Sequence, residues 1–251
     1  MPDHWSVAWN VDAGCFSDVG RVRQRNEDSA RISARPALYA VADGMGGHRA
    51  GDRASRIAVE SLLDYLNRAS GSSAGPAEDL FRQAFQCSNR NIIEDAAGHP
   101  DRLGMGTTLT ALVLSGRQYW IGHIGDSRAF LIRLDAVEQL TDDHSIVAAQ
   151  VREGGMTAEE AKAHPMRHVL SRCLGVELEP QVDVLQGEVE DGDVFVLASD
   201  GLTSVLAAED IAASVRTASD AASASRALVE EACSRDGSDN ITAVVVACHS
   251  Q

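Results

Sequence analysis

Two stretches far apart in the chain share a pattern that limits how it can fold. Leu38–Ala42 is an apolar run that leads into Asp43 and a glycine-rich turn, and Val194–Ala198 leads in the same way to Asp200 and a glycine. Each pattern predicts a buried strand that delivers a carboxylate at its end, after which Asp-Gly turns the chain. We expect the fold to bring these two carboxylates together with Asp239 to hold divalent metal ions.

Acids occupy four such positions at strand ends: Asp43, Asp126, Asp200 and Asp239. Hard cations such as Mg²⁺ and Mn²⁺ prefer oxygen ligands and keep several waters, so few carboxylates are needed for each ion. Glycine at position 44 lets its carbonyl oxygen approach an ion without an intervening side chain. A single Asp-Gly is more often a turn former, but the joint occurrence favours a metal site.

Composition limits the class of protein and its partners. A length of 251 residues suits one large domain or two small ones with a substantial core. The net charge of −15 disfavours nucleic acid and anionic membrane surfaces as partners. Five scattered cysteines without a CxxC pair favour reduced thiols. With no signal peptide and no apolar run near the ~20 residues of a membrane span, we expect a monomeric cytoplasmic protein.

Periodicity predicts a helical layer beside a β-rich block. Apolar residues repeat at helical spacing over 54–66 and over 80–92, which predicts an antiparallel hairpin on one face of a sheet. Strands are expected at 107–114, at 118–124 and at 129–134. The short turns between these strands predict antiparallel pairing of neighbours in sequence.

The second half of the chain returns to the same elements after an interruption. Residues 141–172 are polar and contain helical fragments at 146–152 and 158–163, which predicts an insertion over the sheet edge. An Ala-rich helical stretch at about 207–234 and a strand at 241–247 close the chain.

One segment in the first half allows two interpretations, and another is expected to be a loop. The charged cluster at 21–29 is either an exposed loop or a segment whose Glu27 and Asp28 lie beside Asp43 in space. Residues 70–76, rich in Ser and Gly, are expected to form a loop.

Several short motifs occur in a fixed order along the chain. They are Val22-Arg23 with Asn26-Glu27-Asp28, Ala42-Asp43-Gly44-Met45-Gly46-Gly47-His48, Gly106-Thr107-Thr108, Gly125-Asp126-Ser127-Arg128, Leu140-Thr141-Asp142-Asp143-His144-Ser145, Ala198-Ser199-Asp200-Gly201-Leu202 and Ser238-Asp239-Asn240. This set resembles that of the metal-dependent Ser/Thr protein phosphatases, the PPM or type-2C family. The resemblance is closest to small bacterial stand-alone members and runs from about residue 13 to residue 248.

The resemblance implies an α+β fold, a four-layer α-β-β-α sandwich of two antiparallel sheets with a helical hairpin on each outer face. Residues 1–251 would form a single catalytic domain. Residues 141–172 resemble the family's flap, a mobile segment beside the active site that is linked to substrate choice. The alternative is a surface insertion without a role in catalysis.

The resemblance also implies a ligand set for two Mn²⁺ or Mg²⁺ ions. Asp43 would bridge the two ions. Asp200 and Asp239 would hold the first ion. The Gly44 carbonyl and Glu27, directly or through water, would serve the second ion.

Three further residues complete the implied site. Asp126, together with Asp200, would bind a third ion of the kind seen in bacterial members. Asp28 would orient a metal-bound water, and Arg23 would clamp the substrate phosphate with its bidentate guanidinium. Two ions about 3.5–4 Å apart would acidify a shared water, whose hydroxide would attack phosphorus in line without a covalent phosphoenzyme.

The proton donor for the leaving alkoxide stays open. Eukaryotic relatives carry a histidine where this chain has Met45. His48 and a metal-bound water near Asp126 are the two alternatives.

Three functions are compatible with the resemblance: an active phosphoserine and phosphothreonine phosphatase, an inactive member that only binds phosphoproteins, and a phosphohydrolase for small molecules. The intact set of metal and phosphate ligands favours the active enzyme. Its expected partners are phosphorylated proteins, among them a cognate bacterial Ser/Thr kinase and the substrates of that kinase.

Overall fold

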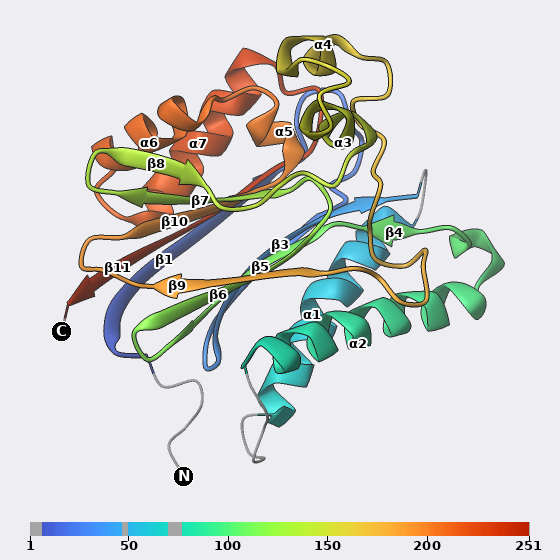
Figure 1. Ribbon diagram of the computed structural model, residues 1–251, viewed down its shortest axis with the longest axis horizontal. Coiled ribbons are helices and arrows are strands. Elements are labelled where there is room, and N and C mark those ends of the chain that lie inside the picture. Colours follow the sequence, from blue (N-terminus) through green and yellow to red (C-terminus); the bar gives the residue numbers. More distant parts are fainter. Residues whose placement is uncertain (1–6, 47–49, 70–76, 251) are drawn as a thin grey trace.

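Two antiparallel sheets face each other at the centre of the molecule (Figure 1). The computed structural model describes residues 7–46, 50–69 and 77–250. The five-stranded sheet runs in the order β1 (Trp9–Asp18), β11 (Ile241–Ser250), β10 (Val194–Ala198), β7 (Arg128–Arg133) and β8 (Ala136–Gln139). The six-stranded sheet runs in the order β2 (Asp28–Ala34), β3 (Ala37–Met45), β5 (Leu109–Ser115), β6 (Gln118–Ile124) and β9 (Asp183–Glu188), with the short β4 (Gly106–Thr107) paired to β3.

Helices cover the outer face of each sheet, which confirms the predicted four layers (Figure 1). The six-stranded sheet is covered by α1 (Gly51–Ala69) and α2 (Ala77–Ala97), and a 3₁₀ turn at Pro100–Arg102 follows them. The five-stranded sheet is covered by α6 (Ala208–Thr217) and α7 (Ala221–Arg235), preceded by the short α5 (Asp200–Thr203). The segment 141–172 contains α3 (Ile146–Arg152) and α4 (Ala158–Ala163).

The central strands carry apolar residues on both faces because both faces are covered. Alternate residues of a strand point to opposite faces. In β3, Leu38 packs in the core under α1 and α2, while Tyr39 packs between the sheets. In β11, Val244 packs between the sheets and Val245 packs under α6 and α7. The continuous apolar runs of the sequence are therefore strands of a sandwich. The strands that lead to Asp43 and Asp200 both finish at the same end of this sandwich.

One predicted pairing is wrong. The short turn at residues 125–127 was expected to join two paired strands, as the turn between β5 and β6 does. Instead β6 pairs with β5 and β9, whereas β7 pairs with β10 and β8 in the other sheet. A tight turn can carry a chain across the corner of a sandwich as well as back along one sheet. The turn therefore places Asp126 where the two sheets meet.

Three strands of the structure were absent from the prediction: β2, β8 and β9. Two predictions, the loop at 70–76 and His48 as a candidate proton donor, lie outside the described residues. Within the described part of the chain, no helix combines the length and the apolar character that crossing a membrane requires.

Candidate active site

Both sheets deliver carboxylates to the same end of the sandwich. Asp28 opens β2 and lies opposite Asp43 near the end of β3 in the antiparallel register. Asp200 follows β10, and Asp239 precedes the neighbouring β11. The interpretation of the 21–29 cluster in which Asp28 lies beside Asp43 is therefore the correct one.

Asp28 is held by hydroxyl groups from the five-stranded sheet. Its Oδ2 accepts hydrogen bonds from Ser199 Oγ at 2.8 Å and Thr242 Oγ1 at 2.6 Å. Burial raises the pKa of Asp28 to about 7; the two hydroxyls lower it, and the charges of Asp200 and Asp239 raise it. Its other oxygen, Oδ1, is buried without a hydrogen-bond donor among the described residues.

The carboxyl groups of Asp43 and Asp200 interact directly. Burial raises the pKa of Asp43 well above its ordinary value, and the charges of Asp28 and Asp200 add to this effect. Burial also acts to raise the pKa of Asp200, but interactions with His168 and with a proton on Asp43 outweigh it and hold that pKa below its ordinary value. These carboxylates repel each other unless a proton or a cation lies between them.

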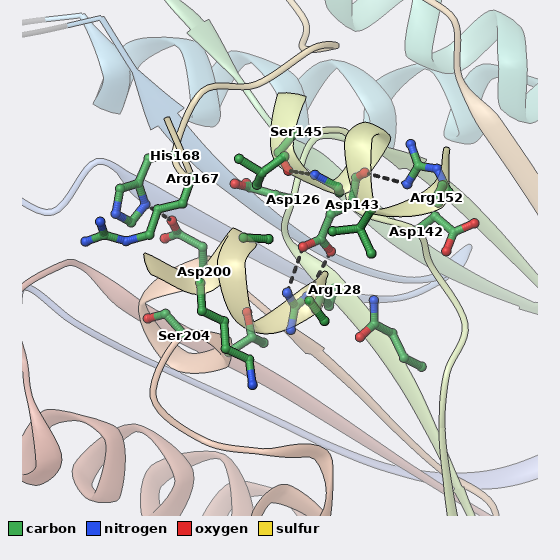
Figure 2. A pocket seen from close by; sticks show the side chains of 18 residues that line it. Asp126, Arg128, Asp142, Asp143, Ser145, Arg152, Arg167, His168, Asp200 and Ser204 are labelled. Atoms are coloured by element: carbon green, nitrogen blue, oxygen red, sulfur yellow. Dashed lines mark hydrogen bonds and ion pairs between the residues drawn. The ribbon is translucent and has the colours of Figure 1, made fainter. Parts of the chain in front are cut away.

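Asp126 lines a cavity of about 620 Å³ between the 141–172 segment and α5 (Figure 2). Burial and the charges of Asp200 and Asp143 raise the pKa of Asp126 to about 8, although Arg128 lowers it. On another side of the cavity, His168 Nδ1 faces Asp200 Oδ2 at 3.7 Å (Figure 2).

Two oxygens of the predicted second ion site approach a single point beside Gly51. A Cβ added to Gly51 would lie 2.7 Å from the Gly44 carbonyl oxygen and 2.8 Å from Glu27 Oε1. Asn240 fixes the backbone of this region, because its Oδ1 accepts a hydrogen bond from the Glu27 amide at 2.8 Å. A side chain at position 51 would therefore fill the space between these two oxygens.

We expect Gly51→Ala to lower the affinity for divalent cations by about 10-fold or more, as perturbing the surroundings of metal ligands commonly does. The added methyl group would displace the Gly44 carbonyl and the Glu27 carboxylate. Isothermal titration with Mn²⁺ measures this effect, and Gly98→Ala, where an added Cβ meets nothing closer than 3.7 Å, is the matched control. Equal affinities of the two variants would contradict the expectation.

Arg23 lies at the edge of the cluster with its side chain half exposed. Its Nη2 donates to Asp239 Oδ2 at 2.8 Å, so it is paired with one of the predicted metal ligands. A pair this exposed contributes about 0–1 kcal/mol to stability. Arg23 can therefore exchange this partner for a phosphate group at little cost.

The donor set fits hard divalent cations. Within the described residues, no three His, Cys, Asp or Glu side chains are arranged as a complete metal site. The acids are instead paired with each other, with hydroxyls and with Arg23. Yet the ligand atoms are all oxygens, and two of them (Asp28 Oδ1 and Asp200 Oδ1) are buried without a hydrogen-bond donor. Burial, with the charges of neighbouring acids, raises the pKa values of Asp28, Asp43 and Asp126. A cation would satisfy all three features.

The residues that support the acids had no assigned role in the prediction from the sequence. Thr108 Oγ1 accepts a hydrogen bond from the Asp43 amide at 2.8 Å, and Ser199 and Thr242 hold Asp28. Asn240 Nδ2 donates to two backbone carbonyls of the 19–25 segment. Ser199, Asn240 and Thr242 each lie within three residues of an aspartate at a strand end, whereas Thr108 is far from any such aspartate in the sequence.

A family model described as protein phosphatase 2C matches residues 20–236. The chain belongs to the protein phosphatase 2C family. The serine/threonine phosphatase Stp of Listeria innocua is 38% identical over 92% of this chain and 93% of the relative. The serine/threonine protein phosphatase PstP of Mycobacterium tuberculosis is 40% identical over 91% of this chain but only 43% of the relative.

Solved structures of this family match the fold closely. The PstP/Ppp phosphatase of Mycobacterium tuberculosis superimposes with a TM-score of 0.86 at 36% identity, covering 95% of this chain and 99% of that chain. The catalytic domain of PstP in complex with two manganese ions superimposes with a TM-score of 0.84 at 35% identity, covering 95% and 98%. This phosphatase thus shares its fold with a family member that binds two metal ions in a crystal.

Proposed function

We propose that this phosphatase is an active protein serine/threonine phosphatase that hydrolyses phosphoserine and phosphothreonine with Mn²⁺ or Mg²⁺ as cofactor. The observation that carries the proposal is the set of partly buried carboxylates that both sheets deliver to one end of the sandwich, with Arg23 beside them. Two family members with related sequences are named Ser/Thr phosphatases, and one binds two manganese ions.

Two ions would be held by residues of both sheets. Asp43 would bridge the ions, Asp200 and Asp239 would complete the first site, and the Gly44 carbonyl with Glu27 would complete the second. When bound, such ions would supply an acidified water as nucleophile at neutral pH. The proximity of Gly44 and Glu27 to one point beside Gly51 supports this assignment.

Three more residues would act around this centre. Arg23 would bind the phosphoryl oxygens and stabilise their charge, since a guanidinium matches two of these oxygens at once. Asp28, oriented by Ser199 and Thr242, would accept a hydrogen bond from the attacking water and hold it in line. Asp126, next to Asp200, would contribute to a third ion site.

We further propose one catalytic domain in which residues 141–172 form a flap beside the site. Its substrates would be proteins phosphorylated by a bacterial Ser/Thr kinase. The enzyme would act in the cytoplasm, where its five free cysteines stay reduced.

Removal of divalent cations should abolish turnover of a phosphothreonine peptide, because the ions would supply both the acidified water and the positive charge beside the phosphoryl group. Phosphate release is measured after treatment with a chelator and again after addition of Mn²⁺ or Mg²⁺. Full activity in the chelator would refute the proposal. A phosphorylated small molecule assayed in parallel distinguishes a protein phosphatase from a phosphohydrolase for small molecules.

We expect Arg23→Ala to raise KM for the phosphothreonine peptide by about 10- to 100-fold, because a charged hydrogen bond to the substrate contributes about 1.5–3 kcal/mol. Arg23→Lys keeps the charge but loses the bidentate contact, so its KM should lie between those of the wild type and Arg23→Ala. Arg21→Ala, on the same segment, is the control. An unchanged KM in Arg23→Ala would exclude the phosphate-binding role.

A further inference from the structure

The first residues of the flap, which we define as residues 141–172, hold the turn that carries Asp126. His144 contacts both polar groups of Gly125: its backbone amide donates to the Gly125 carbonyl at 2.7 Å, and its Nδ1 accepts from the Gly125 amide at 3.2 Å. The His144 side chain is 2% exposed. One buried residue of the flap therefore fixes the peptide group immediately before Asp126.

The hydrogen bond at Nδ1 decides where the ring proton lies. Because Nδ1 accepts a hydrogen bond from the Gly125 amide, the neutral ring carries its own proton on Nε2. Nε2 lies 3.0 Å from Asp183 Oδ2 in β9 and donates to it. Asp183 thus orients the ring so that Nδ1 faces Gly125.

The same carboxylate also binds the other end of the flap. Arg172 Nη1 donates to Asp183 Oδ1 at 3.1 Å. Arg172 also lies 3.3 Å from His144 Nε2, but both of these nitrogens are donors, so Arg172 acts through Asp183. The two ends of the flap are joined further by the Ser171 amide, which donates to the His144 carbonyl at 2.8 Å.

The base of the flap is also fixed to the five-stranded sheet. Asp143 accepts two hydrogen bonds from Arg128 of β7, at 2.8 and 2.7 Å (Figure 2). The turn at residues 125–127 has little conformational freedom, because Gly125 has a φ of +112° and an added Cβ would lie 2.5 Å from the Thr108 side chain. A displacement of the flap base must therefore move the Asp126 turn with it.

We propose that His144 is a positioning residue that couples the flap to Asp126, with Asp183 holding the imidazole in the orientation that this requires. The proposal rests on the proposed function, in which Asp126 contributes to a third cation site. Groups that orient metal ligands typically change metal affinity 10- to 100-fold when they are removed. The His144 ring is buried and is bonded to the turn at Gly125, so its effect on Asp126 passes through Gly125.

Two substitutions test the contacts of the two ring nitrogens, Nδ1 and Nε2, one at a time. His144→Asn places an amide oxygen where Nδ1 accepts from Gly125 but does not reach Asp183, and His144→Gln reaches Asp183 but leaves the Gly125 amide unpaired. Mn²⁺ binding is counted by electron paramagnetic resonance of the free ion. The third cation site is identified as the one that is present in the wild type and lost in Asp126→Asn. The Mn²⁺ affinity of that site should fall about 10-fold or more in His144→Gln and by less in His144→Asn.

Hydrogen exchange tests the coupling without any metal. In Asp183→Asn, amides of the flap and of residues 124–128 should both exchange faster, because the ring loses its orientation. Asp95→Asn is the matched control: Asp95 also accepts from two side chains, Arg53 and Arg102, each at 2.7 Å, but outside this region. It should leave exchange at 124–128 unchanged.

Faster exchange in the flap alone would overturn the proposal, as would wild-type Mn²⁺ affinity at the Asp126-dependent site in His144→Gln. If Asp126→Asn binds as many Mn²⁺ ions as the wild type, the third cation site of the proposed function fails. The exchange experiment then still decides whether His144 couples the flap to the turn.

Discussion

Asp43→Asn and Asp200→Asn should each reduce kcat on a phosphothreonine peptide by about 10³-fold or more, since several kcal/mol of charge stabilisation are lost and each 1.36 kcal/mol is a factor of ten. Asparagine has the shape of aspartate but cannot carry the charge that would bind the cations. Turnover at saturating Mn²⁺ and the number of bound Mn²⁺ ions are measured together, and both should fall.

The stability of the Asp43 variant in chelator distinguishes a loss of cations from a loss of fold. The raised pKa of Asp43 means that the native state prefers this side chain uncharged. A neutral amide there should therefore leave Tm in chelator unchanged or higher. Asp52→Asn, an exposed position in the first turn of α1 beside the cluster, is the matched control and should keep wild-type turnover. Near-native rates in both Asp43→Asn and Asp200→Asn would mean that these residues are not ligands.

The strand-end acids could be predicted because their information is local. A buried strand followed by Asp-Gly specifies where the carboxylate lies on its own strand, and the order of the motifs suggested that several such ends meet. The structure brings Asp43 and Asp200 together from opposite sheets, as the sequence predicted.

The missed strands lack the apolar pattern that predicts strands. β2 and β9 are edge strands with no fully buried residue, so their sequences carry polar residues on both faces. β8 is also an edge strand and has only four residues. Edge strands form through backbone pairing with a neighbour that the local sequence does not contain.

The supporting contacts could not be predicted for a similar reason. Asp28 is separated from Ser199 by 171 positions and from Thr242 by 214, and only the packing of the two sheets defines these pairs. The same holds for His144 and Asp183, which are 39 positions apart. The acids of the site could therefore be predicted from the sequence, whereas the residues that orient these acids could be identified only from the fold.

Without divalent cations, the protein should become less stable as the pH rises from 7 to 8.5. The pKa of Asp28 is raised from 3.8 to about 7 and that of Asp126 to about 8, and the pKa of Asp43 is well above its ordinary value. The unfolded chain is already deprotonated at these groups, so the native state holds more protons and loses stability as it gives them up. The titration of Asp28 and Asp126 alone accounts for a loss of about 1.5 kcal/mol, or roughly 3–6 °C in Tm for a domain of this size, and Asp43 acts in the same direction.

The pH window isolates these acids from most other groups. Burial lowers the pKa of His123 and His144, so these histidines change stability only below the unfolded pKa near 6.5. His168 titrates in the same direction as the acids, because its interaction with Asp200 raises its pKa, and His168→Asn measures that contribution. Asp126→Asn removes one acid and relieves its neighbours, so its Tm in chelator should fall less steeply between pH 7 and 8.5.

Saturating Mn²⁺ should abolish this dependence of stability on pH. Cations bind the deprotonated carboxylates, so their stabilising effect grows as the pH rises through the same window. Thermal unfolding followed by circular dichroism, in chelator and in saturating Mn²⁺, gives the two slopes directly. A Tm in chelator that stays constant or rises between pH 7 and 8.5 would show that the carboxylates are not protonated together in the native state. The burial and charge repulsion that would favour a cation in this cluster would then be absent.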